Sequence, residues 1–309
     1  MWTRKILAVT VILLLVSLLM SGAVSAKGTD LEFKSIPAKD ITLIKKQTVN
    51  EPQSWTKGHN RQKVGAATGV LGQTVSGHKH AIVIGISDYP GTSSDLKYAD
   101  DDAQTMADVL IEVYGFSPAD VIVLIDSNAT AQNIFDAVSD TKREAKANDE
   151  VLFFFSGHGG SGIADDGDKE KWDEAIVSWG DSQDFVYIWD GQLEDWFSAF
   201  ETSRIVFIFD SCYAGGMNDL ADPGRVICAA SGENTFSYEY ASLQHGEFTY
   251  YFAVEGINQG YADIYDHNQD GVLGQSSDVV VEEAFDYAKA NCRHDNPNIS
   301  DNFTNDLLP

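Results

Sequence analysis

The sequence predicts an α/β fold with a mainly parallel central sheet, and three observations support this prediction. Two short runs of bulky apolar residues, 151–155 and 205–209, are each bounded by turn residues, which is typical of buried parallel strands. Segments with strand character alternate along the chain with segments of helical periodicity. Strands joined in this way through helices lie parallel, with right-handed crossovers. We therefore expect one large α/β domain in residues 79–309.

The first half of this domain contains two expected strand and helix pairs. Residues 80–86 (HAIVIGI) predict the first core strand. Apolar residues then recur at helical spacing over 103–113, and Gly115 is expected to end that helix. Residues 120–125 predict a second strand and residues 131–145 a second helix with one apolar face.

The second half contains the two apolar runs, a hairpin, a fifth core strand and two more helices. The hairpin is expected between 175–179 and 185–188, the fifth strand at 225–230, and the helices at 192–200 and from Gly246 onward.

The N-terminal residues have the composition of a targeting segment. Residues 1–26 contain Arg4 and Lys5, an apolar run and then small residues ending at Ala26. This pattern predicts a secretory signal peptide, because the apolar run is short for a membrane-spanning helix. We expect a secreted or extracytoplasmic protein with no stable membrane association after signal cleavage.

The next residues, 27–78, are expected to form a flexible basic pro-segment or linker, because they lack sustained periodicity and end in a Gly, Ser and Thr-rich stretch. Charge changes sign close to the end of this segment. Residues 27–80 contain nine Lys and Arg against four Asp and Glu, whereas residues 81–309 contain ten against 43. A domain this acidic excludes nucleic acid as a partner. The functional explanations of the acidity are calcium and cationic substrates, and the alternatives are solubility or a salty habitat.

Each apolar run leads to a residue that can take part in acyl chemistry. Residues 151–155 lead to His158 within SGHGG, and residues 205–209 lead to Cys212 within DSC. The carboxyl ends of parallel strands meet at one edge of the sheet, where sites are built. A thiol needs a nearby base or acid for acyl chemistry, so the pair predicts a cysteine peptidase. The alternative is a buried Cys and a His that serve only the fold.

The three cysteines leave one thiol unpaired in an exported chain. If Cys228 and Cys292 form a disulfide, Cys212 is the odd thiol, which suits a nucleophile. The alternative is three free thiols.

These motifs resemble those of the caspase-like cysteine peptidases, most of all the metacaspase branch, and they are also similar to the legumain type. The resemblance covers residues 80–257 and includes three looser segments, 84–89 (IGISDY), 96–103 (LKYADDDA) and 246–251 (GEFTYY). It implies a caspase-like three-layer sandwich. The motif DSCYAG has Asp210 where a caspase has Gln, which argues against aspartate specificity.

The resemblance assigns the chemical roles. It implies that the thiol of Cys212 attacks the scissile carbonyl and that His158 protonates the departing amine. The expected oxyanion donors are the backbone N–H groups of Gly159 and Cys212, because preorganised donors act where charge develops.

The resemblance also implies which residues bind the substrate. In metacaspases an acidic residue two positions before the nucleophile selects Arg or Lys, together with an Asp after the first strand and a Ser two positions before the His. The matching residues are Asp210, Asp102 and Ser156. A buried carboxylate pair is costly unless a cation completes it, which also favours a basic side chain. As alternatives, Asp102 serves only the start of its helix, or the enzyme is a legumain-like peptidase or transpeptidase with Asn preference.

Residues 262–290 contain a calcium-loop-like segment. The sequence DHNQDGVL matches the first half of an oxygen-rich calcium loop, but Ser277 stands where the closing Glu is expected. The expected ligands are Asp266, Asn268, Asp270, the carbonyl of Val272 and, after an insertion, Glu283. The alternative is a solvated acidic turn.

The resemblance implies a second calcium site, because metacaspases commonly need calcium bound by an acidic cluster after the His strand. The candidate ligands are Asp165, Asp166, Asp168, Asp173, Asp181, Asp184 and Asp219. The alternative is solvated surface charge. No organic cofactor is expected.

The expected partners are peptide or protein substrates and the protein's own N-terminal segment. If the pocket takes Arg or Lys, then Lys45, Lys46, Arg61 and Lys63 supply a basic segment that can occupy an acidic cleft and be cut on activation. A passive spacer is the alternative for this segment. For the whole chain, the alternative from another class is a catalytically inactive calcium-binding surface protein.

Overall fold

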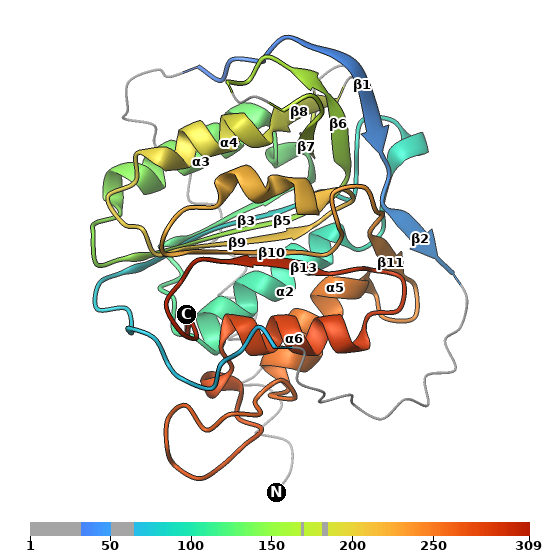
Figure 1. The fold of residues 1–309 in the computed structure, drawn as a ribbon. Coiled ribbons are helices and arrows are strands. Elements are labelled where there is room, and N and C mark those ends of the chain that lie inside the picture. The colour runs from blue at the N-terminus through green and yellow to red at the C-terminus, as the bar shows by residue number, and fades with distance from the viewer. Residues whose placement is uncertain (1–31, 51–64, 168–169, 181–184) are drawn as a thin grey trace, which may run out of the picture. The chain divides into compact units, whose positions relative to one another are not determined.

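The computed structural model describes residues 32–50, 65–167, 170–180 and 185–309 (Figure 1). The signal peptide expected at residues 1–26 lies outside these residues, as do Arg61, Lys63, Asp168, Asp181 and Asp184. Among the described residues, no helix combines the length and apolar character needed to cross a membrane.

The central sheet has six strands in the order β13-β10-β9-β5-β3-β4 (Figure 1). The strands are β3 (Lys79–Gly85), β4 (Val121–Ile125), β5 (Glu150–Ser156), β9 (Ile205–Asp210), β10 (Arg225–Ala229) and β13 (Asn298–Asp301). All neighbours pair in parallel except β10 and β13. The apolar runs therefore form the middle of a mainly parallel sheet, as predicted.

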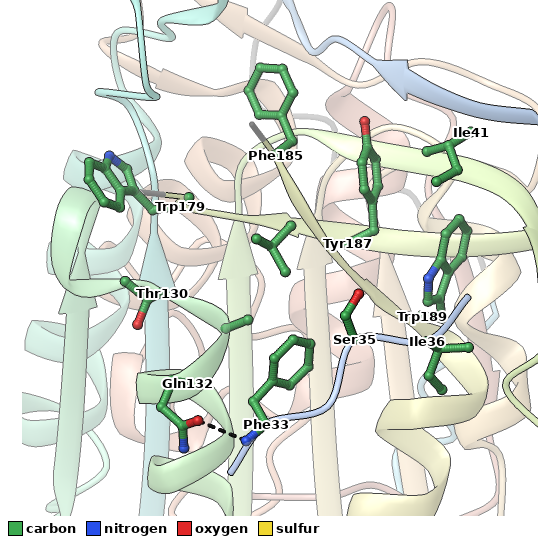
Figure 2. A pocket seen from close by; sticks show the side chains of 13 residues that line it. Phe33, Ser35, Ile36, Ile41, Thr130, Gln132, Trp179, Phe185, Tyr187 and Trp189 are labelled. Carbon is green, nitrogen blue, oxygen red and sulfur yellow. Dashed lines mark hydrogen bonds between the residues drawn. The ribbon is translucent and has the colours of Figure 1, made fainter. Parts of the chain in front are cut away.

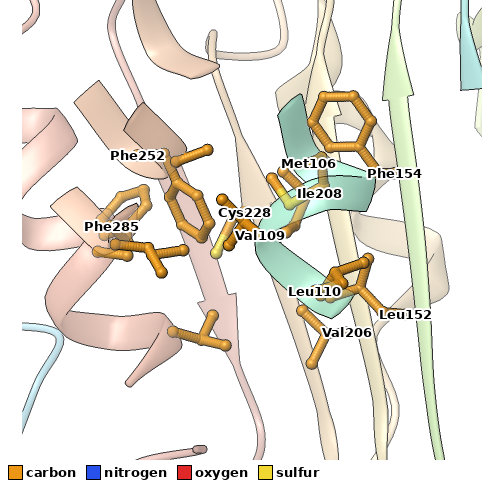
Figure 3. Packing of buried hydrophobic residues seen from close by; sticks show 14 of the residues in the cluster. Met106, Val109, Leu110, Leu152, Phe154, Val206, Ile208, Cys228, Phe252 and Phe285 are labelled. Carbon is orange, nitrogen blue, oxygen red and sulfur yellow. The ribbon is translucent and has the colours of Figure 1, made fainter. Parts of the chain in front are cut away.

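Helices cover both faces of this sheet, which confirms the three-layer sandwich (Figure 1). They are α2 (Ala99–Glu112), α3 (Ala131–Glu144), α4 (Asp190–Ser198), α5 (Glu247–Thr249), the π-helix η4 (Tyr250–Asn258) and α6 (Val281–Asn291), with short 3-10 turns η1 (Thr92–Ser94), η2 (Asp126–Asn128), η3 (Ala214–Leu220) and η5 (Ser276–Asp278). One apolar cluster lies between the sheet and α2, η4 and α6 (Figure 3). A second lies between the sheet and α3 and α4. Two dry layers on a parallel sheet make its central strands rigid supports for the loops at their ends.

Two smaller sheets flank the carboxyl edge of the central sheet. The first is antiparallel, in the order β1-β6-β7-β8, with β1 (Ala38–Ile44), β6 (Gly159–Ala164), β7 (Asp173–Ser178) and β8 (Val186–Trp189). The second has the order β12-β11-β2, with β2 (Gln47–Val49), β11 (Tyr238–Tyr240) and β12 (His245–Gly246). The hairpin expected between 175–179 and 185–188 corresponds to β7 and β8.

The structure differs from the sequence prediction at residues 38–49. These residues lie within the segment expected to be a flexible linker, yet they form β1 on β6 and β2 on β11. Most residues of β1 are exposed, those of β2 are exposed or half-buried, and neither strand shows the apolar alternation that would mark it in the sequence. They exist because the domain offers two open sheet edges with unpaired N–H and C=O groups.

Of the two possibilities for the cysteines, the structure has three free thiols and no disulfide between Cys228 and Cys292. Cys228 is fully buried in β10 within the apolar cluster below the sheet (Figure 3). Cys292 follows α6 and packs against the same cluster. The open alternative of three free thiols therefore holds in this structure.

Candidate active site

The register of β5 and β9 brings His158 and Cys212 to the same place. Ser156 is the ladder partner of Asp210, and each strand ends there. His158 and Cys212 each lie two residues beyond these partners, so both emerge from adjacent strands at the same level. The side chain of each is buried, with about 1% of its surface exposed. The site predicted from the two motifs is therefore assembled by a sheet register that the apolar runs dictate.

Hydrogen bonds fix the His158 ring in one tautomer. Its Nε2 lies 2.8 Å from the carbonyl oxygen of Ser94, which can only accept, so Nε2 carries a proton. Its Nδ1 accepts the backbone N–H of Lys46 at 3.1 Å. Burial, assisted by the charges of Lys45 and Lys46, lowers the pKa of His158 to about 4, so the ring is neutral at pH 7. The nitrogen available for proton transfer is thus Nδ1.

Tyr89 holds this ring from one face. The two rings are stacked, with centroids 4.7 Å apart. The Tyr89 hydroxyl accepts the backbone N–H of His158 at 2.9 Å and donates to the carbonyl of Val177 at 3.0 Å. Tyr89 therefore ties the His158 loop to β7, and sequence reasoning had included it only within a looser motif.

The thiol of Cys212 lies against the start of β11. Its Sγ accepts the backbone N–H of Ser237 at 3.2 Å. Burial raises the pKa of Cys212 to about 12, so the group is a neutral thiol in this structure. The next residue, Tyr213, has a left-handed backbone with φ of 60°, which turns the chain sharply after the nucleophile.

The two predicted oxyanion donors are adjacent. A Cβ atom on Gly159 would collide with the carbonyl oxygen of Cys212, so only glycine allows the His158 loop to approach the nucleophile this closely. Gly159 also begins β6, where it pairs with Ile176 of β7 and Ile44 of β1.

Asp210, Asp102 and Ser156 meet in a fully buried pocket. The Ser156 hydroxyl donates to Asp102 Oδ2 at 2.8 Å. Asp210 is held by the hydroxyl of Ser237 at 2.7 Å and by the hydroxyl of Thr249 at 2.6 Å. The structure thus brings together all three predicted substrate-binding residues.

Residues around β12 complete the pocket. Asp102 Oδ1 lies 3.0 Å from His245 Nδ1 and accepts the backbone N–H of Gly246 at 3.0 Å. A Cβ on Gly246 would collide with Asp210 and come within 2.7 Å of Lys46 Nζ, so glycine is needed to leave room for a cation. Sequence reasoning missed His245, Ser237 and Thr249 as pocket residues, although the looser GEFTYY motif contains Gly246 and Thr249.

The pocket contains the side chain of Lys46. Its Nζ lies 2.7 Å from Asp210 Oδ1 and 3.6 Å from Asp102 Oδ2, and it donates to the Ser156 hydroxyl at 3.1 Å. Burial opposes a charge on Lys46, but attraction to Asp210 and Asp102 outweighs it and raises the pKa of Lys46. Burial likewise opposes the charge on Asp210, but the nearby ammonium holds the pKa of that carboxyl below its usual range. The pocket therefore holds one cation, the Lys46 ammonium.

A separate cavity of about 550 Å³ lies beside β8 and the start of α3 (Figure 2). Its lining includes Phe33, Trp179, Phe185, Tyr187 and Trp189. It does not include His158 or Cys212.

A second group of acidic side chains lies at the start of β7. One carboxylate oxygen from each of Asp166, Asp173 and Asp190 lies within 4.8 Å of the others. Burial, followed by repulsion from neighbouring carboxylates, raises the pKa of Glu174 to about 8. Burial also raises the pKa of Asp190 to about 9. Such an oxygen-rich group suits a hard cation such as Ca²⁺.

In the calcium-loop-like segment, the side-chain oxygens of the expected ligands accept hydrogen bonds from backbone N–H groups of the same loop. Asp266 accepts the backbone N–H groups of Asp270 and Gly271, and Asn268 Oδ1 accepts that of Asp270. The side chain of Asp270 accepts the backbone N–H of Val272, which is exposed.

Glu283, the expected closing ligand, lies on α6. Its oxygens accept the backbone N–H groups of Ile264, Tyr265 and Val280. Among the described residues, Asp266, Asp270 and Glu283 do not form a group of side chains with ligand atoms within 4.8 Å of one another. Glu283 therefore anchors the start of the loop in this structure.

Comparisons with known proteins agree with this geometry. Residues 79–221 match the model of the metacaspase, peptidase C14 domain. Metacaspase-7 of Arabidopsis thaliana is 29% identical over 220 residues, which cover 65% of this chain and 52% of that protein. Metacaspase-1 of Schizosaccharomyces pombe is 32% identical over 155 residues, which cover 48% of this chain and 36% of that protein. The chain thus spans about half, or less, of the length of these curated relatives.

The fold also has a counterpart among solved structures. The crystal structure of a protein from Geobacter sulfurreducens matches with a TM-score of 0.54 at 17% identity, over 72% of this chain and 93% of that chain. At this identity the likeness concerns the fold alone.

Proposed function

We propose that this chain, which belongs to the caspase/metacaspase superfamily of C14-type peptidases, is an exported cysteine endopeptidase that cleaves after Arg or Lys. One observation carries the proposal. The ammonium of Lys46 is fully buried between Asp210 and Asp102, and Asp210 precedes the nucleophile Cys212 by two residues. The Lys46 ammonium stands in for the cationic side chain of a substrate residue.

The first half of the reaction forms an acyl-enzyme. The Cys212 thiol gives its proton to His158 Nδ1, and the sulfur bonds to the substrate carbonyl carbon. Negative charge then develops on the carbonyl oxygen, next to the backbone N–H groups of Gly159 and Cys212. As the C–N bond breaks, His158 returns its proton to the departing amine.

The second half releases the acid product. Water attacks the thioester, its proton passes through His158 Nδ1, and the sulfur leaves and is reprotonated. The bond from Nε2 to the Ser94 carbonyl keeps Nδ1 directed at the reacting atoms in both halves. Tyr89 holds the ring plane in place.

Electrostatics supports specificity for basic residues. Two buried carboxylates facing one site repel each other and lose hydration, so a neutral side chain would leave them uncompensated. An Arg or Lys side chain removes that cost, as Lys46 does. An Asn side chain, which the legumain-like alternative requires, would bring no charge to balance Asp210 and Asp102.

We further propose that a calcium ion binds at the Asp166, Asp173 and Asp190 group. The carboxylates of this group are within ligand distance of one another, and Glu174 lies beside them with an Oε2 that has no hydrogen-bond partner among the described residues. Glu174 also touches the nucleophile loop, because a Cβ on Gly216 would collide with its carboxylate. Bound Ca²⁺ would neutralise these charges and fix β7 against η3.

A peptide panel tests the function. Peptides that differ only in Arg, Lys, Asn or Asp before the scissile bond are incubated with the protein, with and without calcium. We expect cleavage of the Arg and Lys peptides and its loss in Cys212→Ala and His158→Ala. Cleavage of the Asn peptide alone would support the legumain-like alternative, and a folded protein that binds calcium but cleaves none would support the inactive binding protein. A mature N-terminus after Ala26 in protein from the culture medium tests export.

A further inference from the structure

The segment that fills the pocket runs through the active site in a particular direction. In a productive complex, the residue whose side chain occupies the Asp210 pocket presents its own carbonyl to Cys212. The amide nitrogen that follows this residue is then the leaving group, and it must face His158. The direction of a bound chain can therefore be read from which of its amides contacts His158.

For Lys46 this order is inverted. The amide that faces His158 Nδ1 belongs to the peptide bond before Lys46: the N–H of Lys46 donates to Nδ1 at 3.1 Å. The amide that follows it, the N–H of Gln47, donates at 3.0 Å to the carbonyl of Ser237. Gln47 thus lies on the side where the acyl part of a substrate belongs.

The strands on either side of Lys46 agree with this inversion. The preceding strand, β1, runs along β6, and Ile44 is the partner of Gly159, the residue after His158. The following strand, β2, pairs in parallel with β11, the strand that begins after Ser237. A chain bound in the opposite direction on β11 would pair with it antiparallel.

Neither peptide bond at Lys46 is set for cleavage. The Lys46–Gln47 bond has its nitrogen on Ser237, away from the proton donor. The Lys45–Lys46 bond has its nitrogen at His158, but its acyl residue lies outside the pocket. The side chain of Lys45 contacts the carbonyl of Ser93 instead, and its own carbonyl accepts from the Gln47 side chain at 2.7 Å.

From these contacts we infer that residues 38–49 are a resident inhibitor bound in reverse, which occupies the specificity pocket through Lys46 and is not cut there. The inference rests on the proposed function for its pocket, and it replaces cleavage at Lys46 as the route to activity. The enzyme becomes active when the segment leaves as an intact chain. An extended basic peptide bound in the same direction in trans would inhibit without being consumed.

Cross-linking tests the direction without any need for activity. In a Cys212→Ala background, the pair Gln47→Cys with Tyr238→Cys joins ladder partners of β2 and β11. We expect it to form a disulfide under mild oxidation. The matched pair, Lys45→Cys with Tyr238→Cys, is expected to remain reduced. Oxidation of the Lys45 pair in preference to the Gln47 pair would overturn the reversed direction.

Kinetics and mass spectrometry test the inhibition. Lys46→Ala in the full chain is expected to raise the rate of Arg-peptide cleavage by about 10-fold or more, because the competent state is no longer a minor one. Lys46→Arg should keep the wild-type rate, and so should Lys39→Ala, which removes an exposed lysine of the same segment.

We expect intact-mass analysis of active wild-type protein to detect no species that begins at Gln47. A chain beginning at Gln47, or equal rates for wild type and a folded Lys46→Ala, would overturn the inhibitor. If every variant fails to cleave basic peptides while the Gln47 cross-link still forms, the proposed function is wrong and the reversed direction stands.

Discussion

Replacing Asp210 with Asn should remove most of the preference for a charged substrate. Asp210 Oδ1 lies 2.7 Å from the bound ammonium, whereas Asp102 Oδ2 lies 3.6 Å away. Two unit charges about 4 Å apart interact by about 4 kcal/mol at an effective dielectric of about 20. Rehydration of the pocket returns part of this, so we expect a net loss of about 3 kcal/mol for Asp210→Asn.

That energy corresponds to a fall of about 100-fold in kcat/KM for a Lys peptide relative to a Gln peptide. For Asp102→Asn we expect about 1.4 kcal/mol, or about 10-fold, because its carboxylate lies farther from the ammonium.

The assay compares paired Lys and Gln peptides in a Lys46→Ala background, so that the resident lysine does not compete. Because Asp210 also accepts bonds from Ser237 and Thr249, the absolute rate can fall for structural reasons. The ratio of the two substrates removes that effect. Equal losses on the Lys and Gln peptides would refute the electrostatic account of the pocket.

Three further predictions concern the dyad and the acidic group. Tyr89→Phe should lower kcat by about 10-fold with little change in KM, because it leaves the backbone N–H of His158 without its hydrogen-bond partner. Tyr187→Phe serves as a control, and an unchanged kcat in Tyr89→Phe would exclude a positioning role for Tyr89. Iodoacetamide should alkylate Cys212 slowly near pH 7.5 in wild type, because burial raises the pKa of Cys212 to about 12. Alkylation should be at least about 10-fold faster in Lys46→Ala, because departure of residues 38–49 exposes the thiol, which outweighs the loss of a Lys46 charge that lowers the pKa of Cys212; a wild-type rate that levels off near pH 8 would contradict this. Calcium should raise the melting temperature by about 5 °C more at pH 8.5 than at pH 6, because protons compete for Glu174 and Asp190, whose folded pKa values are about 8 and 9. Without calcium, Glu174 and Asp190 destabilise the folded state progressively as pH rises from about 4, the ordinary pKa of such carboxyls, to their folded pKa values of about 8 and 9. Asp190→Asn should abolish the calcium shift and Asp270→Asn should retain it, and the reverse pattern would move the site to the loop.

The central strands and the dyad could be predicted because they depend on local sequence. A run such as 151–155 is apolar on both faces, and a parallel sheet buries both faces, so burial and strand direction follow together. Once β5 and β9 are neighbours, the register fixes His158 opposite Cys212. The pocket could be predicted only through the resemblance to metacaspases, because Asp102 lies on α2, far from Asp210 in the sequence.

The role of residues 38–49 could not be predicted in the same way. The strand β1 is mostly exposed and β2 has only three residues, and both form on edges supplied by residues more than 100 positions away. Charge complementarity marked Lys46 as a candidate for the acidic cleft. The direction in which it enters depends on the partners of two backbone amides, which no side-chain pattern encodes.

The most direct test of the central claim is covalent labelling of Cys212 by a peptide electrophile that ends in Arg, measured by intact mass in the Lys46→Ala protein. We expect stoichiometric labelling at Cys212, loss of labelling in His158→Ala, and much slower labelling by the matched Asn electrophile. Equal labelling by both electrophiles, or labelling that persists without His158, would contradict a His158–Cys212 peptidase with an acidic specificity pocket.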